Sequence, residues 1–128
     1  MFDLATFEEY LQHNGSTKEN ISKIRGVTYN LVNGKIEKTK FSKKDIIKEK
    51  VSKTLDLKKF TLPNVKEGSI IEVKYDVSSD YYRYINPWVF QKIGAPTRYS
   101  EFNIEIPEFY TFNTVSYTHL TLPTICSV

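Results

Sequence analysis

The sequence lacks the residues from which reactive centres are usually built. Its single cysteine, Cys126, excludes an intrachain disulfide and leaves any thiolate metal site without ligands. The two histidines, His13 and His119, are far apart in the chain, and neither belongs to a cluster with the spacing of a metal site. The five glycines are isolated and form no phosphate-binding loop. These absences predict a protein that is not an enzyme and that holds no metal and no cofactor.

Charge and hydropathy exclude further classes of protein. The net charge of +3, from 18 basic and 15 acidic side chains, is too small to indicate a nucleic-acid partner. No apolar run is long enough to span a bilayer, and no apolar segment of the kind found in signal peptides follows Met1. A hydrophobic fraction of 40% is too high for a disordered tail. The composition therefore favours one small folded domain without a membrane span.

The C-terminal stretch has an origin of its own. Val115–Val128 reads as the in-frame translation of a transposase-type sequencing adapter, with the junction inside the codon of Thr114. We therefore expect residues 114–128 to be a non-native tail and residues 1–113 to be a truncated β-rich domain. Cys126 and His119 then drop out of the search for chemistry. His13 remains, beside a polar Asn-Gly-Ser segment that predicts a solvated loop.

Three segments carry clear strand signals. Val27–Thr39 has Asn33-Gly34 at its centre, the pair that favours a type I′ turn, and so predicts a hairpin. Ser69–Val77 and Tyr99–Ile106 both alternate apolar with polar side chains, as expected for half-buried strands. The predicted inward faces are Ile71, Val73, Tyr75 and Val77 in the first, and Ser100, Phe102, Ile104 and Ile106 in the second.

Other segments of the sequence carry weaker signals of secondary structure. Phe60–Leu62 leads into a turn at Pro63–Gly68, which predicts a second hairpin with the strand that follows. Trp88–Gln91 is a further candidate strand after the break at Asn86-Pro87. Short helical turns are predicted where a hydroxyl precedes an acidic residue by three positions, at Ser42 with Asp45 and at Thr6 with Glu9. The first of these has apolar residues at helical spacing as far as Leu55.

The fold class follows from these elements. Alternating strands joined by tight turns predict a mainly β protein, an antiparallel, sandwich-like domain with one or two short helical turns. Its core consists of the inward faces, so replacing Val73 or Ile104 by alanine is expected to cost about 2–4 kcal/mol.

The candidate binding residues are aromatic. Tyr81, Tyr82, Tyr84 and Trp88 lie in one segment of eight residues, together with Arg83. Aromatic side chains at this density can form a platform for a sugar, a peptide or a nucleic-acid base. They can equally close the end of a core or pack on a neighbouring domain, and we favour that interpretation because Trp88 and Phe90 share a strand face.

Six segments of the chain together carry a resemblance to a known family: Ile21–Leu31, Asn33–Ile36, Phe60–Tyr75, Trp88–Gln91, Tyr99–Phe102 and Ile106–Glu108. The resemblance extends from about Ile21 to Asn113, and its most specific part is the proline–glycine turn with the long strand that follows. In these segments the chain resembles the uncharacterised domain that precedes a transglutaminase-like domain in exported bacterial proteins.

The resemblance implies a partner and a location. In that family the parent chain begins with an export signal and continues into a papain-like core that carries Cys, His and Asp. It implies that the present chain is a non-catalytic accessory module, which packs on the adjoining transglutaminase-like domain or positions its substrate, in a periplasmic or cell-envelope protein. The alternative is an independent module that binds a glycan or an extended peptide.

Overall fold

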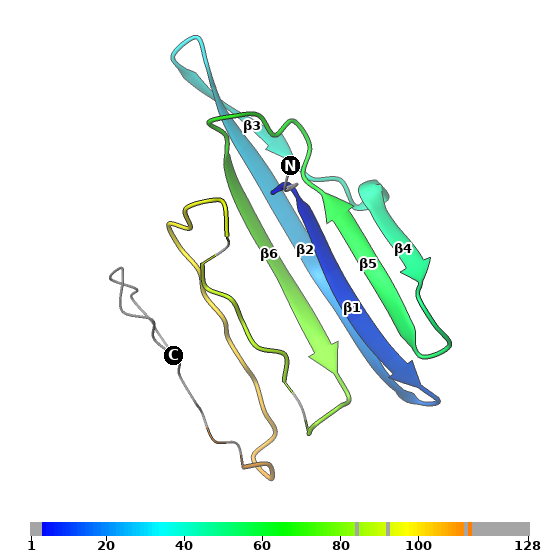
Figure 1. Ribbon diagram of the computed structural model, residues 1–128. Helices are drawn as coiled ribbons and strands as arrows, with labels where there is room; N and C mark the ends of the chain where they lie inside the picture. The colour runs from blue at the N-terminus through cyan, green and yellow to red at the C-terminus, as the bar shows by residue number, and fades with distance from the viewer. Residues whose placement is uncertain (1–3, 84, 92, 112, 114–128) are drawn as a thin grey trace. The chain divides into compact units, whose positions relative to one another are not determined.

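The computed structural model describes residues 4–83, 85–91, 93–111 and 113, so the expected tail at 114–128 lies outside the described residues. The chain divides into two units, Met1–Arg83 and Tyr84–Val128, and each is described by itself. The first unit is mainly antiparallel β, which confirms the predicted fold class (Figure 1). Its elements are β1 (Thr6–Asn14), β2 (Thr17–Val32), β3 (Lys35–Lys40), the 3₁₀ turn η1 (Lys43–Asp45), β4 (Ile46–Lys50), β5 (Leu55–Thr61) and β6 (Ile70–Ser79).

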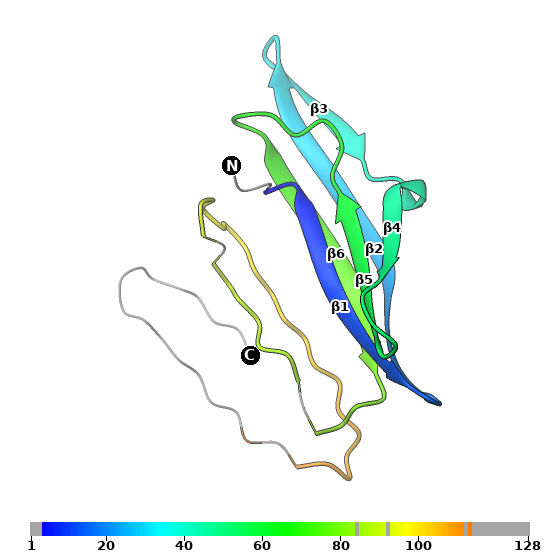
Figure 2. The same cartoon turned by 45° about the vertical axis from the view of Figure 1, so that its right-hand side comes forward.

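Strand β2 organises the sheet because it pairs with three others. Its start pairs with β1, its length from Glu19 to Tyr29 pairs with β6, and its end pairs with β3. The full order is β3-β2-β1-β5-β4, with β6 also on β2, and all of these pairs are antiparallel. β1 pairs with β2 only at His13–Lys18 and Asn14–Thr17, and from Thr6 to Gln12 it pairs with β5 instead. The result is one open sheet that curls, with β1, β5 and β4 in one half and β2, β3 and β6 in the other (Figure 2).

The hairpin between β2 and β3 is confirmed. Val32 pairs with Lys35, and the two residues between them have positive φ, 50° at Asn33 and 74° at Gly34. These are the dihedrals that a type I′ turn needs, and asparagine and glycine tolerate them best.

A bulge in β2 adjusts which side chains face the core. The pairing with β6 shifts between Ser22 and Arg25, and Lys23 has a φ of 51°. Without the extra residue, Ile21 and Ile24 would point to opposite faces, since side chains alternate along a strand. With it, both side chains are buried in the same cluster.

The core lies between the two halves of the curled sheet. Leu11 of β1, Phe60 of β5, and Ile21 and Ile24 of β2 form its buried centre. Phe60 is 1% exposed, stacks on Phe7 at 5.4 Å between ring centroids, and meets Tyr75 edge-on. The partly buried side chains packed around this centre are Phe7, Phe41, Ile46, Val73 and Tyr75. Val73 and Tyr75 thus lie on the face of β6 that the alternation predicted.

The predicted second hairpin is wrong. β5 pairs with β1 and β4, whereas β6 pairs with β2, so residues 62–69 cross from one half of the sheet to the other. Hydrogen bonds to the buried Asn30 hold this crossing. Its Nδ2 donates to the Asn64 carbonyl oxygen at 2.8 Å, and its Oδ1 is bonded to the hydroxyl of Ser69. The proline–glycine turn was correctly placed, but the sequence does not show which strand each side of it joins.

The two predicted helical turns have different outcomes. Ser42 caps the 3₁₀ turn η1, where its Oγ accepts from the Lys44 N–H at 3.4 Å, but the chain then enters β4 and forms no helix as far as Leu55. The turn predicted at Thr6 with Glu9 is wrong, because these residues lie in β1. The pairing of β1 with β5 supplies partners for its backbone and buries Leu11, which outweighs a local capping pattern.

The second unit differs from prediction. Tyr99–Ile106 and Trp88–Gln91 were expected to be strands, but the described part of this unit contains no strand. Ile104 is 48% exposed, so its side chain is not buried as a core residue would be. The expected cost of 2–4 kcal/mol for Ile104→Ala is therefore withdrawn, while the expectation for Val73 stands.

Candidate functional site

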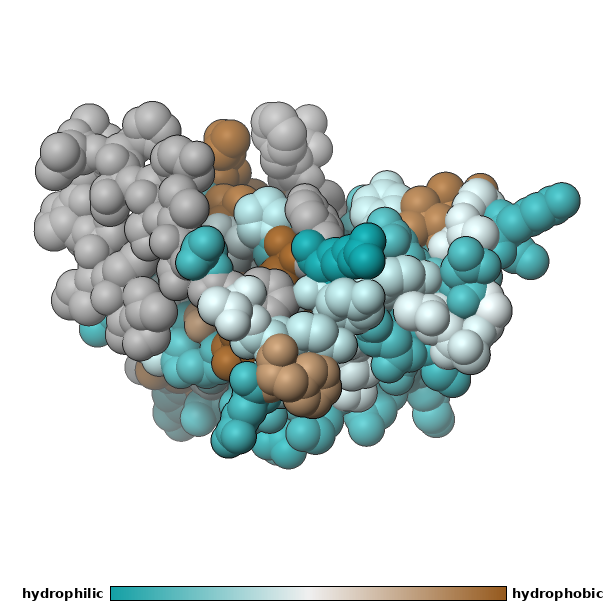
Figure 3. Space-filling model, turned by 90° about the horizontal axis from the view of Figure 1, so that it is seen from below, coloured by the Kyte–Doolittle hydropathy of each residue, from teal (hydrophilic) through white to brown (hydrophobic). Residues whose placement is uncertain are grey.

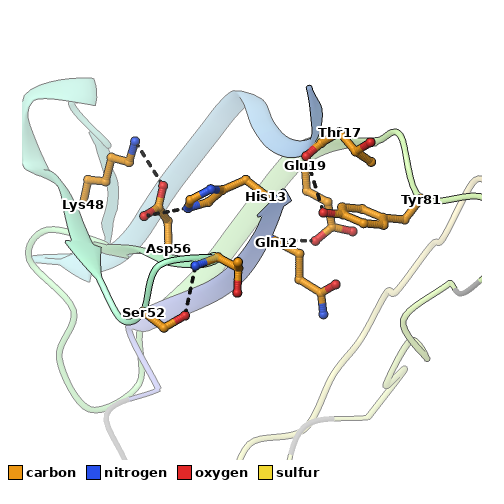
Figure 4. Close-up of polar contacts among 9 residues, drawn as sticks. Gln12, His13, Thr17, Glu19, Lys48, Ser52, Asp56 and Tyr81 are labelled. Atoms are coloured by element: carbon orange, nitrogen blue, oxygen red, sulfur yellow. Dashed lines mark hydrogen bonds and ion pairs between the residues drawn. The ribbon is translucent and has the colours of Figure 1, made fainter. Parts of the chain in front are cut away.

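The predicted aromatic residues of the first unit have local roles. Tyr81 is half-buried, and its hydroxyl donates to the Thr17 carbonyl oxygen at 3.4 Å, close to the β1–β2 turn (Figure 4). Tyr82 is exposed, and the guanidinium carbon of Arg83 lies 5.6 Å from the centre of its ring. Tyr84 lies outside the described residues. Tyr81 thus supports the fold, and Tyr82 offers a ring to solvent beside a cation.

Trp88 belongs to the second unit. Its ring stacks on Phe102 with centroids 5.3 Å apart and planes 5° apart, and its Nε1–H donates to the Ser100 hydroxyl at 2.9 Å. One face and the polar group of the indole are therefore engaged locally. The predicted residues are divided between two units, and no surface made of all four is described.

A charged hollow in the first unit was not predicted. It has a volume of about 350 Å³ and is lined by His13 of β1, Lys48 and Lys50 of β4, and Asp56 of β5. Strand register explains why these side chains share one face. Across β1, β5 and β4, the inward positions form rows of three side chains, one from each strand. One row is apolar, and the next two rows contain charged side chains. The rows are Phe7, Phe60 and Ile46; then Glu9, Lys58 and Lys48; then Leu11, Asp56 and Lys50.

Asp56 is the centre of the polar contacts in this hollow. Its Oδ1 lies 3.5 Å from Nε2 of His13 and its Oδ2 lies 3.3 Å from Nζ of Lys48, with both side chains directed at the carboxylate (Figure 4). Partial burial on its own raises the pKa of Asp56, but the hydrogen bonds and charges of Lys48 and His13 outweigh it and lower that pKa.

The prediction for His13 was wrong, and the spacing of the inward residues of β1 is the sequence signal that was missed. It was expected in a solvated loop, but it lies in β1, and its side chain is 34% exposed beside Asp56. Phe7, Leu11 and His13 are spaced by even numbers of residues, as inward positions of one strand must be. The alternation was present in the sequence, but the charged Glu9 at the inward position between Phe7 and Leu11 interrupted its apolar pattern.

The surroundings of the hollow are polar. Seen from below, the described surface is hydrophilic over much of its area and also carries separate hydrophobic patches (Figure 3). The side chains that line the hollow are all polar or charged. Within the described part of the chain, no three histidine, cysteine, aspartate or glutamate residues are grouped so that they could hold a metal ion. The chemistry available here is hydrogen bonding and ion pairing by lysine, histidine and one carboxylate.

A second unpredicted feature lies on the outer face of β2, β3 and β6. Leu31 pairs with Ile36, and two residues earlier on β2 Tyr29 pairs with Ile70. Directly opposed residues point to the same side of a sheet, so these side chains share one face. Leu31, Ile36 and Ile70 are 74%, 68% and 67% exposed. We call these three residues the outer apolar cluster.

Comparison with known proteins does not identify the chain. Neither a family model, nor a curated protein, nor a solved structure matches it. In the described ranges, no helix has the length and hydropathy needed to cross a bilayer.

Proposed function

We propose that this chain is a non-catalytic accessory module that packs against an adjoining domain through the outer apolar cluster. By the resemblance of the sequence, that domain is transglutaminase-like and the parent protein is exported to the periplasm or cell envelope. The module supports its neighbour or positions the neighbour's substrate, and it carries out no reaction itself.

The observation that carries this proposal is the exposure of three large aliphatic side chains on one face. Leu31, Ile36 and Ile70 are each two-thirds or more exposed, although the sheet has a core in which apolar groups are buried. Each square ångström of apolar surface removed from water contributes about 25 cal/mol, so covering these side chains would be favourable.

The rim of the cluster also fits an interface. Tyr29 lies beside the cluster and donates its hydroxyl to Glu72 at 3.0 Å, while Nζ of Lys38 lies 5.5 Å from the centre of the same ring. An apolar centre bordered by an aromatic ring and charged side chains is typical of protein interfaces. The polar rim orients a partner, whereas the apolar centre supplies most of the affinity.

The test requires the partner domain encoded beside this module in the intact gene. That domain would be produced separately, and its binding to the full chain measured by calorimetry. Leu31→Ser and Ile70→Ser should each weaken binding by about tenfold. The matched control is Ile47→Ser, which removes an exposed isoleucine from β4 in the other half of the sheet and should leave binding unchanged.

Two results would contradict the proposal. One is an intact gene in which no domain with the Cys, His and Asp residues of a transglutaminase-like core accompanies this module. The other is equal binding by Leu31→Ser, Ile70→Ser and Ile47→Ser.

The alternative function, binding of an extended peptide or a glycan, has one structural observation in its favour. Among the described residues, β6 pairs with no strand except β2, so its other edge could accept a peptide as an added strand. Titration of the chain with cell-wall peptides and glycans, followed by fluorescence of Trp88 and by shifts of the β6 amides, separates the two ideas. A saturable response with no partner domain present favours the alternative.

A further inference from the structure

We propose that the charged hollow lined by His13, Lys48, Lys50 and Asp56 binds a small oxyanion, a carboxylate or a phosphate group. This inference is independent of the proposed function, because the hollow and the outer apolar cluster lie on different faces and different strands.

The two lysines of the hollow lie on the inward face of β4. Ile46 packs against the core, and inward positions recur at every second residue of β4, so Lys48 and Lys50 occupy inward positions as well. In register, Lys48 stands opposite Lys58, and Lys50 stands opposite Asp56. The concave face of this half of the sheet therefore collects ammonium groups at the end where the apolar core stops.

The side chains that line the hollow carry more positive than negative charge. Two lysines face one carboxylate in the hollow, and His13 can add a further positive charge. The Asp56 carboxylate is shared between Lys48 and His13, whereas within the described residues Lys50 has no ion-pair partner. The other charged groups of this face are engaged elsewhere: Nζ of Lys58 donates to Asn20 at 3.1 Å, and Glu9 accepts from the Tyr75 hydroxyl at 2.5 Å.

The arrangement matches what an oxyanion needs. Lys50 supplies an ammonium group without an ion-pair partner among the described residues, while Asp56 fixes the positions of Lys48 and His13. The Lys48 ammonium has further N–H groups for a ligand, and His13 has a second N–H when its imidazole is protonated. Hydrogen bonds between such cations and a carboxylate or phosphate are among the stronger polar contacts in proteins. A volume of about 350 Å³ is enough for the anionic end of a small ligand.

Inward-pointing lysines on an edge strand have another known effect. β4 pairs only with β5 among the described strands, and charged side chains on such a strand discourage pairing with another chain. That effect requires charge on β4 alone. It does not require that His13 of β1 and Asp56 of β5 converge with the lysines on one hollow, which is what the structure shows.

The test uses His13 as a reporter at the site. The imidazole signals of the full chain are followed by nuclear magnetic resonance at constant pH during titration with sodium phosphate, with sodium acetate, and with sodium chloride at matched ionic strength. The second histidine, His119, serves as an internal reference. We expect a saturable shift of the His13 signal with phosphate, acetate or both, and none with chloride. Comparison of the phosphate and acetate titrations distinguishes a phosphate site from a carboxylate site.

Matched variants separate a site from general attraction between charges. Lys50→Gln should weaken anion binding by about threefold or more. Lys35→Gln removes the same charge from the exposed strand β3 and should leave binding unchanged. If Lys50→Gln perturbs the fold, Lys48→Gln is used in its place. If both variants perturb the fold, the titration of the wild type decides alone. The proposal is overturned if phosphate and acetate act no differently from chloride, or if Lys35→Gln weakens binding as much as the substitutions in the hollow.

Discussion

Two segments of this chain have the same alternating pattern and different structures. Ile70–Ser79 is strand β6, whereas Tyr99–Ile106 is irregular. β6 is paired along β2 from Glu19 to Tyr29, and its Val73 and Tyr75 pack on the core. The second segment has no strand pairing, and its Ile104 is about half exposed. Alternation of side chains is thus not sufficient for a strand, and pairing with a neighbouring strand distinguishes the two segments.

The two units also differ in the range of their contacts. Phe60 of β5 contacts a residue distant in sequence, since its ring stacks on that of Phe7 in β1. In the second unit, Trp88 contacts Phe102 and Ser100, and the Gln91 side chain donates to Ala95, all within a short stretch of chain. The first unit therefore depends on long-range packing, whose loss should affect the whole sheet.

The largest expected effect is at Phe60. Phe60→Ala removes the most buried aromatic ring of the core and should lower the free energy of unfolding by about 3–5 kcal/mol. Ile104→Ala, in the second unit, should change it by less than about 0.5 kcal/mol. Urea denaturation of both variants checks this contrast. Equal losses would show that Ile104 belongs to the same core.

A smaller effect is expected where β2 approaches the crossing segment. A Cβ atom on Gly26 would stand 2.3 Å from Cδ2 of the buried Leu62 and 3.1 Å from Cβ of Phe41. Gly26→Ala should therefore cost about 1–3 kcal/mol through overpacking. In the double variant with Leu62→Ala, the added methyl group has space, so the two losses should be less than additive. Strict additivity would show that Leu62 does not occupy this position.

The smallest effect concerns Asp56 and depends on pH. Lys48 and His13 hold the pKa of Asp56 below its ordinary value, so the native state favours the charged carboxylate. The stabilisation is complete above the ordinary aspartate pKa of about 3.9 and is lost as the pH falls through the lower native pKa. Asp56→Asn should therefore be less stable than the wild type near neutral pH, and the difference should shrink in acid.

The measurement is a set of urea curves for the wild type, Asp56→Asn and Lys48→Gln between about pH 6 and pH 2. Because Lys48 is one cause of the lowered pKa, Lys48→Gln should reduce the same pH dependence. A difference between wild type and Asp56→Asn that grows as the pH falls would contradict this assignment.

Features that depend only on neighbouring residues could be predicted from the sequence. Asn33-Gly34 specified the β2–β3 turn, Ser42 specified a short helical turn, and the alternation in β6 specified its inward face. Each of these features depends on a few adjacent residues, because turn dihedrals, capping and strand periodicity are local properties.

Features that depend on distant pairing could not be predicted. The register that places Lys50 opposite Asp56 is set by how β4 and β5 pair, and the sequence of β4 alone reads as a solvated lysine-rich face. The same holds for the outer apolar cluster, since Leu31 and Ile70 meet on one face only through the pairing of β6 with β2. Both candidate surfaces therefore arise from topology and not from any motif.

Hydrogen exchange of backbone amides in the full chain tests most directly whether pairing, and not alternation, makes the strands. We expect slow exchange for the amides of β2, β5 and β6 that take part in the sheet, and fast exchange throughout Tyr99–Ile106. Protection of Tyr99–Ile106 equal to that of β6 would contradict the account, because it would reveal a paired strand in the second unit.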